Sequence, residues 1–307
     1  MYNIKKSKIM KKYITIAVLL MAGLQLSAQQ YITFSQYMLD PYSINPGVVG
    51  TKNYLPLAMG YHQSWTGFKN SPNMQMISGH TAINSEMGVG AKIYNFSAGP
   101  SSKSGIEGTY AYRLKFGDDM HLSLGLSLLL YQVYLNRDKL DLKDPDDAIL
   151  YAGNTDKLIV PDASFGAYFY TGNYFAGLSV TQLVNRKVDF MTDVLTENQV
   201  RHYYLIGGYK YEINDNFTVE PSVLGKFIEA GVFQMDLNAK VIFKKMFWGG
   251  LSYRFGDAGV IMMGVDLDNL TFGYSYDLTM TDIGKYSNGS HEIMLILKMG
   301  KTSASKF

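Results

Sequence analysis

Residues 231–243 read GVFQMDLNAKVIF. From Phe233 to Phe243 every second residue is apolar, and most residues between them are polar. A period of two predicts a β-strand with two unlike faces. In a water-soluble protein the apolar face packs on a core, whereas in an outer-membrane barrel it faces lipid and the polar face lines the lumen. The rest of the sequence has to distinguish these two environments.

The beginning of the chain has the pattern of a secretory signal peptide. Five lysines precede an apolar run at residues 14–24, and Leu26-Ser27-Ala28 follows as a small-residue cleavage site. The apolar run is too short to cross a membrane as a helix. We therefore expect export of the chain and treat residues 1–28 as a leader outside the fold.

Charge and cysteine content narrow the function classes. The leader holds five of the 28 basic and none of the 26 acidic side chains, which leaves 23 basic against 26 acidic and a net charge of −3 for the mature chain. Nothing in this balance indicates a nucleic-acid partner. The absence of cysteine excludes disulfides, thiolate metal sites and Cys catalysis. After the leader no apolar run approaches the length of a membrane-spanning helix.

From about residue 55 the chain divides into alternating segments typical of strands. We predict an all-β protein, a transmembrane antiparallel β-barrel of about 14 strands. The predicted strands are 56–65, 73–83, 87–97, 104–116, 120–136, 161–171, 173–184, 200–212, 216–228, 232–243, 246–256, 259–267, 269–279 and 290–299.

The connections between these strands sort into two sets. The connections after even-numbered strands are all short, and every long one, at 137–160, 185–199 and 280–289, follows an odd-numbered strand. Outer-membrane barrels have short periplasmic turns and longer extracellular loops. An even number of strands then places both chain ends on the periplasmic side.

Aromatic residues mark the ends of three neighbouring predicted strands. Two of the pairs are separated by ten residues, which at about 3.3 Å per residue and a tilt near 40° rise about 25 Å. This is the height of the apolar band of such a barrel, which carries aromatic girdles at both edges. The pairs are Phe217 with Phe227, Phe233 with Phe243, and Phe247 with Phe255.

The opposite strand faces carry charges of both signs. A charge on the lipid face near the midplane costs roughly 2–4 kcal/mol, so these side chains should face the lumen. The lumen-facing candidates are Glu107, Arg113, Lys210, Glu220, Lys226, Asp236, Lys240, Arg254, Asp277 and Glu292.

Two local features carry further predictions. Gly-Leu-Ser occurs at 125–127, 177–179 and 250–252, and in each case the period places Leu outward and Gly and Ser inward. Pro221 lies inside a predicted strand, where proline cannot donate to the ladder, so we expect a bulge or an unpaired spot there.

Little in the sequence indicates chemistry. The five histidines show no ligand spacing, and no G-x-S-x-G is present, although Ser64 lies close to His62. Four aspartates in the loop 137–160, Asp141, Asp144, Asp146 and Asp147, could bind calcium, but a solvated loop is the favoured interpretation. We predict no enzyme activity, no cofactor and no metal site.

Residues 29–54 differ in character from the strands. They are rich in tyrosine, include Pro41, Pro46 and Gly47, and show no sustained alternation. A 14-stranded wall encloses more room than its own side chains fill. This segment therefore either stays in the periplasm or enters the lumen as a plug, and the sequence predicts four parts: the leader 1–28, this segment, the barrel 55–300 and a tail 301–307.

Four stretches in this order resemble the PorP/SprF family of outer-membrane proteins. They are FSQYMLDPYSINPGVVG at 34–50, PDASFGAYFYTGNYFAGLSVTQL at 161–183, VEPSVLGKF at 219–227 and FWGGLSYRFGDAGVIMMGV at 247–265. Asn45, Pro46 and Gly47 match the family's N-terminal Asn-Pro motif, for which we expect a structural role.

The resemblance implies a non-enzymatic component of the type IX secretion and gliding motility machinery. Members of this family bind, export or anchor a secreted cell-surface protein such as an adhesin, through the C-terminal domain of that cargo, or link the outer membrane to other secretion and periplasmic components. The expected partners are therefore outer-membrane lipid, such a secreted protein and other parts of the machinery. The alternative is an outer-membrane porin or small-molecule transporter, which the charged lumen would suit.

Overall fold

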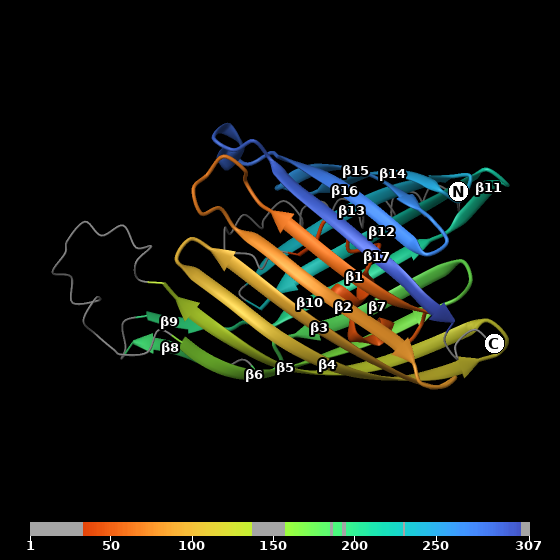
Figure 1. The fold of residues 1–307 in the computed structure, drawn as a ribbon, viewed down its shortest axis with the longest axis horizontal. Coiled ribbons are helices and arrows are strands. Elements are labelled where there is room, and N and C mark those ends of the chain that lie inside the picture. The colour runs from red at the N-terminus through yellow and green to blue at the C-terminus, as the bar shows by residue number, and fades with distance from the viewer. Residues whose placement is uncertain (1–32, 137–156, 185–186, 192–194, 230, 302–307) are drawn as a thin grey trace, which may run out of the picture.

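The structure is a closed antiparallel β-barrel (Figure 1). The computed structural model describes residues 33–136, 157–184, 187–191, 195–229 and 231–301 of the 307. Each strand pairs with its neighbours in sequence, β1 pairs with β17, and β10 pairs with both β7 and β12, which leaves the ring without an edge. Because β10 and β11 are two parts of one strand position, the wall has 14 positions, as the sequence predicts.

All predicted strands are present, with ends that differ by a few residues. The strands of the wall are β1 Tyr54–Gln63, β2 Asn73–Ala82, β3 Met87–Ala98, β4 Ser101–Phe116, β5 Met120–Leu135, β6 Lys157–Tyr170, β7 Tyr174–Thr181, β10 His202–Tyr209, β11 Tyr211–Asn214, β12 Phe217–Ile228, β13 Val232–Phe243, β14 Phe247–Arg254, β15 Ala258–Asp266, β16 Leu270–Thr279 and β17 Ser290–Lys301. Among the described residues, no helix is long and apolar enough to cross a membrane.

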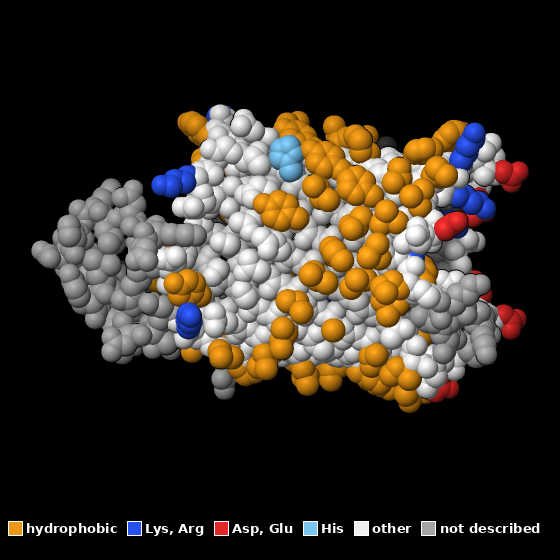
Figure 2. All heavy atoms as spheres, viewed as in Figure 1, with side chains coloured by type: hydrophobic (Ala, Val, Ile, Leu, Met, Phe, Trp, Pro, Cys, Tyr) orange, Lys and Arg blue, Asp and Glu red, His pale blue; other side chains and the backbone are white. Residues whose placement is uncertain are grey.

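The alternation of apolar and polar residues along β13 separates two environments. On β13, Leu237 and Val241 are 45% and 41% exposed, whereas Asp236 and Asn238 are 4% and 6% exposed. Figure 2 shows hydrophobic side chains over the middle of the barrel and charged ones toward its two ends. The apolar face therefore points out of the barrel, and the polar face points into it.

The aromatic residues at the strand ends also face outward. Phe217 pairs with Phe243 on the neighbouring strand, their rings 4.9 Å apart, and Phe243 pairs with Phe247. At the other end of the same wall Phe227 pairs with Phe233. These rings are exposed in two rows, as expected for girdles at the edges of an apolar band.

The two rims differ as predicted. One rim, here called the short-turn rim, carries the connections 83–86, 117–119, 171–173, 215–216, 244–246 and 267–269. The opposite one, the long-loop rim, carries 64–72, 182–201, 280–289 and the connection from β5 to β6, as well as three shorter turns. In outer-membrane barrels the short turns are periplasmic, so we place the long-loop rim at the cell surface.

Three details differ from the sequence-based expectation. The connection 185–199 contains a small hairpin, β8 Lys187–Met191 with β9 Leu195–Asn198, whose strands are too short to show a clear period. Strand β6 begins at Lys157, four residues before the predicted start at residue 161. The conflict at Pro221 produces an unpaired spot rather than a bulge, because pairing of β12 stops after Ser222 and resumes at Val219 without a change of register.

Residues 33–53, here called the inner segment, lie inside the barrel and precede β1. They contain two short 3-10 turns, η1 Pro41–Ser43 and η2 Pro46–Val48; a third, η4 Asp282–Lys285, lies in the loop 280–289. Phe34, Tyr37 and Tyr42 are at most 2% exposed and are surrounded by inward side chains of the wall. The core of this protein is therefore the contact between the inner segment and the wall. The predicted leader, residues 1–28, lies outside the described residues.

Candidate functional site

The inner segment crosses the lumen from one rim to the other. Its first residue, Thr33, lines a cavity that also includes Gln182 and His202, which lie at the long-loop ends of their strands. Its last part, at Lys52, lines a second cavity together with Gly172 and other residues of the short-turn rim. Strand β1 starts at the short-turn rim as predicted, and the described chain begins toward the long-loop side of the lumen. The expectation that both chain ends are periplasmic concerns residues outside the described ones.

The Asn45-Pro46-Gly47 motif forms the central turn of the inner segment. Asn45 precedes η2, and its side-chain oxygen accepts from the Gly47 N–H at 2.8 Å. Its amide nitrogen donates to the carbonyl of Ala167 on β6 at 3.1 Å. Proline fits the first position of the turn because no N–H is needed there. One side chain therefore both closes the turn and attaches it to the wall.

Three glycines of the wall leave room for this motif. A Cβ atom at Gly125 would lie 2.3 Å from the Pro46 carbonyl carbon, and one at Gly166 would lie 2.1 Å from the Asn45 Oδ1. A Cβ at Gly177 would lie 2.7 Å from the Asn45 Nδ2. These glycines come from the neighbouring strands β5, β6 and β7, and two of them belong to the repeated Gly-Leu-Ser. They form a flat seat, here called the glycine seat.

Further inward glycines fit other parts of the inner segment. A Cβ at Gly60 would lie 2.6 Å from the Phe34 ring, one at Gly88 2.7 Å from the Val49 carbonyl oxygen, and one at Gly273 2.1 Å from the Gln36 Oε1. The wall is therefore shaped to this segment around much of its circumference. Side chains in a close-packed interior do not tolerate such overlaps.

Glu292 attaches the beginning of the inner segment to β17. Its carboxylate accepts from the backbone N–H groups of Ser35 and Gln36 at 2.7 and 2.8 Å. It also lies 2.9 Å from Nδ1 of His62 on β1. Glu292 is fully buried, so these charge-assisted contacts replace the water that a carboxylate requires.

Ser64, His62 and Glu292 together resemble the layout of a hydrolase triad. The Ser64 hydroxyl lies 3.1 Å from His62 Nε2. The backbone N–H groups around this serine, however, are already used, because those of Ser64 and Trp65 donate to Pro72 and Ser290. An oxyanion site needs free donors beside the nucleophile. These contacts form a buried clasp for the beginning of the inner segment.

Arg254 and its carboxylates extend this clasp. The Arg254 guanidinium lies 3.3 Å from Asp236 and 3.4 Å from Asp277, and it donates to the Ser35 hydroxyl at 3.0 Å. Ser35 in turn donates to Asp277 at 2.5 Å. Four sequence candidates, Glu292, Asp236, Arg254 and Asp277, are thus brought together on strands β13, β14, β16 and β17.

On the other side of the lumen, Lys92 and Arg113 contact the inner segment, and Glu107 pairs with Lys92. Lys92 pairs with Glu107 at 3.1 Å and donates to the Ser43 carbonyl at 3.5 Å. Arg113 donates to the carbonyl oxygens of Gly50 and, at 2.7 Å, of Asn84. Glu107 and Arg113, two further residues predicted to face the lumen, therefore also hold the inner segment, Arg113 directly and Glu107 through Lys92.

Asp40 is the one acidic residue of the described inner segment. It accepts from the Ser78 hydroxyl on β2 at 2.7 Å. Asp40 is thus held by a neutral hydroxyl and lies near the positive charge of Lys92.

The remaining candidates lie elsewhere on the inner face. Lys226 is buried on β12 at 2% exposure. Lys240 pairs with Glu220 at 2.6 Å near the short-turn rim. Lys210 pairs with Glu212 at 3.0 Å, and both of these side chains are largely exposed at the mouth of the lumen.

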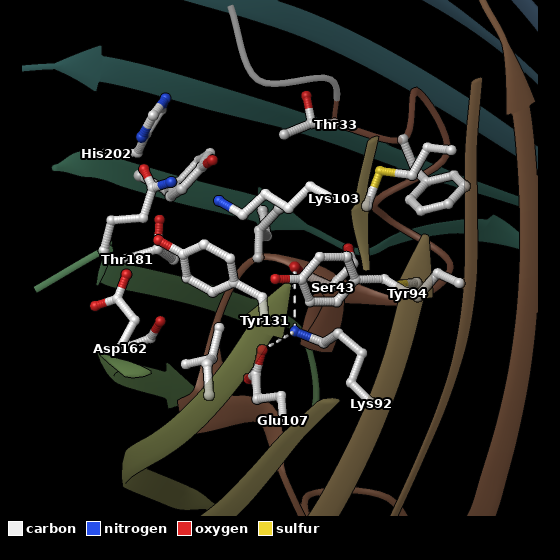
Figure 3. Close-up of a pocket in the computed structure, with 18 residues that line it drawn as sticks. Thr33, Ser43, Lys92, Tyr94, Lys103, Glu107, Tyr131, Asp162, Thr181 and His202 are labelled. Atoms are coloured by element: carbon white, nitrogen blue, oxygen red, sulfur yellow. Dashed lines mark hydrogen bonds and ion pairs between the residues drawn. The ribbon is translucent and has the colours of Figure 1, made fainter. Parts of the chain in front are cut away.

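The inner segment leaves a cavity on each side. The external cavity, toward the long-loop rim, is small, with a volume of about 80 Å³. Figure 3 shows its tyrosines, Tyr94 and Tyr131, together with Lys103, Asp162 and His202, and with the Lys92–Glu107 ion pair on the opposite side from Thr33. The second, the periplasmic vestibule, is larger, with a volume of about 340 Å³, and its lining includes Lys52, Lys210, Lys240 and Lys298.

The described part of the chain contains no group of three metal-binding side chains. The aspartates of the loop 137–160 that could bind calcium according to the sequence lie outside the described residues. Sequence reasoning missed the glycine seat and the roles of Ser35, Gln36 and His62. The repeated Gly-Leu-Ser was the one available signal, since it placed two of the seat glycines on the inner face.

Comparison with known proteins identifies the family. Residues 26–297 match the family described as type IX secretion system membrane protein PorP/SprF. The chain belongs to the PorP/SprF family. This PorP/SprF protein is therefore a membrane protein of the type IX secretion system, and its barrel is of the outer-membrane type. No curated protein sequence matches the chain significantly.

Solved structures of other outer-membrane proteins share the barrel only distantly with this PorP/SprF protein. The outer-membrane protein Omp33 of Acinetobacter baumannii is 8% identical, with a TM-score of 0.48, 81% of this chain covered and 100% of that chain. A Pseudomonas aeruginosa FadL homologue is 9% identical, with a TM-score of 0.48 and coverages of 83% and 93%. The KdgM porin is 9% identical, with a TM-score of 0.40 and coverages of 80% and 99%. At this level the likeness carries no argument about function.

Proposed function

We propose that this PorP/SprF protein is a closed outer-membrane barrel that binds a secreted cell-surface protein at its long-loop rim, and so exports it or holds it at the surface. Membership of the type IX secretion family supports this role. The cargo would bind through its C-terminal domain, as the family resemblance implies, and other secretion components would meet the barrel at the periplasmic rim.

The observation that carries the proposal is the inner segment. A diffusive channel needs an open lumen, but here the lumen is occupied from rim to rim by residues of the chain itself, and inward glycines fit them closely. The carboxylate of Glu292 and the guanidinium of Arg254 hold its beginning. This favours a binding role over the alternative of a porin or small-molecule transporter.

The loop 280–289 offers a contact surface at the cell-surface side. Tyr286 is 77% exposed there, next to η4. Exposed tyrosine is enriched at protein interfaces because it combines a large apolar ring with a polar tip. We therefore choose Tyr286 as the first position at which cargo binding is tested.

The test is purification of the tagged, intact protein from its own outer membrane, followed by identification of what accompanies it. We expect a large secreted surface protein to be recovered, and we expect Tyr286→Ala to reduce its yield several-fold. Asp215→Ala, in a short turn at the opposite rim, should leave the yield unchanged. A barrel that is always isolated without a surface protein would refute the proposal.

A further inference from the structure

The periplasmic vestibule differs from the external cavity in its charge. Its lining holds four lysines and two acidic side chains, which gives a net formal charge of +2. The lining of the external cavity holds two lysines and two carboxylates, whose charges cancel. An excess of one sign in a cleft with low-dielectric walls attracts ligands of the opposite sign. The charged residues that line the vestibule are Lys52, Lys210, Lys240, Lys298, Glu220 and Asp266.

Each acidic side chain of this lining is paired with one lysine. Glu220 lies 2.6 Å from the ammonium group of Lys240. Asp266 pairs with Lys298 and also accepts from the Thr271 hydroxyl at 2.5 Å. Because the charges of these two pairs cancel, the net positive charge of the vestibule comes from the other two lysines.

Lys52 and Lys210 supply this net charge. Lys52 belongs to the inner segment, and its side chain is exposed although it lies within the lumen, where it lines the vestibule. Lys210 follows β10 and contacts Glu212 at 3.0 Å. The side chain of Glu212 is 62% exposed, and an ion pair this exposed contributes less than about 1 kcal/mol, so Lys210 can change partner at little cost.

The rest of the lining suits a short peptide that carries an anion. Tyr54, Tyr174 and Tyr209 combine hydroxyl groups with large rings, and Thr51 and Asn173 add further polar groups. A bound carboxylate needs hydrogen-bond donors as well as a counter-charge, and the rings offer apolar area to the chain beside it. A volume of about 340 Å³ is within the range of ligand pockets and suits a short extended segment rather than a folded domain.

The exposed rim around the vestibule has the opposite sign. Among the described side chains of the short-turn rim, six exposed ones are acidic and three are basic. A broad acidic surface is therefore repelled at the rim, whereas a narrow segment can carry an anionic group past it to the lysines. The rim residues are Glu86, Asp118, Asp119, Glu212, Asp215 and Asp268, with Lys115, Lys244 and Lys245.

We propose that the periplasmic vestibule binds a narrow peptide segment of a periplasmic partner, with a carboxylate at its tip against Lys52 and Lys210. The inference deepens the proposed function and rests on it, because it gives the chemistry by which another secretion component meets the barrel at the periplasmic rim. The site exists only while the inner segment is in place, since Lys52 is part of that segment.

The test uses the purified, intact protein in a nonionic detergent and two peptides that differ at the tip. Acetyl-Ala-Ala-Asp with a free carboxyl terminus carries two carboxylates, and acetyl-Ala-Ala-Asn amide carries none. Ligand-observed NMR measures both dissociation constants, and we expect the acidic peptide to bind at least about tenfold more tightly. Its binding should weaken several-fold when the NaCl concentration rises from about 50 to about 500 mM, because salt screens the lysines.

Two double variants test the lysines. Lys52→Gln with Lys210→Gln should weaken binding of the acidic peptide at least about tenfold. Lys244→Gln with Lys245→Gln, in a short turn outside the lining, should change it less than about twofold. Unheated gels establish that both variants are folded, and the two peptides and the salt series on the unaltered protein decide the matter even if one is not.

Equal binding of the two peptides, binding that does not depend on salt, or undiminished binding in Lys52→Gln with Lys210→Gln would overturn the inference. Inorganic phosphate is the third probe. If it binds through the same two lysines while neither peptide binds, the site takes small anions and the peptide inference is wrong. Since no outcome involves a secreted surface protein, failure here and failure of cargo binding can be told apart.

Discussion

Gly108 and Gly125 lie on the adjacent strands β4 and β5. Only at Gly125 do the neighbouring atoms leave no room for a side chain. Nothing lies within 4 Å of a Cβ atom built at Gly108, which is exposed on the outer face. A Cβ at Gly125 would lie 2.3 Å from the Pro46 carbonyl carbon. At the scale of single residues, the inner segment therefore decides which positions of the wall must lack a side chain.

We predict that Gly125→Ala lowers the free energy of unfolding by about 1–3 kcal/mol, because the added methyl group forces Pro46 out of the glycine seat. Gly108→Ala, the matched control, should change it by less than about 0.5 kcal/mol. Urea unfolding of both variants in lipid vesicles measures the difference. Equal stability of the two variants would show that the seat does not constrain the inner segment.

The two faces of β13 provide a second prediction. Leu237→Asp places a charge on the lipid side and should reduce the folded fraction in membranes, at a cost of about 2 kcal/mol. Asn238→Asp, one residue further, keeps the side-chain size within the polar lumen, beside the Tyr37 hydroxyl. The folded fraction on unheated gels measures both, and equal tolerance of the two variants would contradict the assignment of the faces.

Glu292 provides a third prediction, since its charge serves three partners at once. Glu292→Gln removes the anion that accepts from Ser35 and Gln36 and faces His62, and we expect a loss of about 3 kcal/mol. Glu212→Gln, whose parent side chain is 62% exposed, should cost less than about 1 kcal/mol. Urea midpoints of the two variants are compared, and similar midpoints would rule out the clasp.

At the scale of elements, Pro221 divides one strand position of the wall into β10 and β11. Gly208 pairs with Ser222, and Tyr211 pairs with Val219. The residues between these pairs, 209–210 and 220–221, do not pair with each other. The ladder to β13 continues through Pro221 opposite Ala239. Because proline has no N–H, the missing donor interrupts one ladder and leaves the other intact.

We predict that Pro221→Val completes the interrupted ladder and raises the free energy of unfolding by about 1 kcal/mol, the usual value of one added hydrogen bond. Hydrogen exchange at Tyr209 should slow at the same time, whereas Lys210, whose N–H already donates to the Asn173 carbonyl, should not change. Ala239→Val, on the paired strand, enlarges a neighbouring outward side chain without adding a donor and serves as control. Unchanged exchange in Pro221→Val would show that the gap has another cause.

At the scale of the whole molecule, the barrel and the inner segment form one body with two separate cavities. The external cavity opens toward the cell surface, and the vestibule opens toward the periplasm. Between them the inner segment is bound by backbone, carboxylate and guanidinium contacts to strands on both sides of the lumen. The inner segment therefore separates the two cavities within the described part of the chain.

We predict that the purified protein in planar bilayers shows no steady conductance. The double variant Gly125→Phe with Gly177→Phe displaces the Asn45-Pro46 turn from its seat and should open ion-conducting events. Gly108→Phe, which adds the same ring on the outer face, should remain closed. A wild-type protein with stable open-channel currents would favour the porin alternative instead.

The strands, their faces and the difference between the rims could be predicted from the sequence, because each depends on a local period or on the length of one connection. Leu237 and Asp236 could be assigned to opposite faces from their neighbours alone. The tertiary structure alone decided the path of the inner segment, the glycine seat and the clasp at Glu292. Those features join residues far apart in the chain, such as Asn45 with Gly166 and Ser35 with Glu292, and no local pattern encodes which distant atoms will meet.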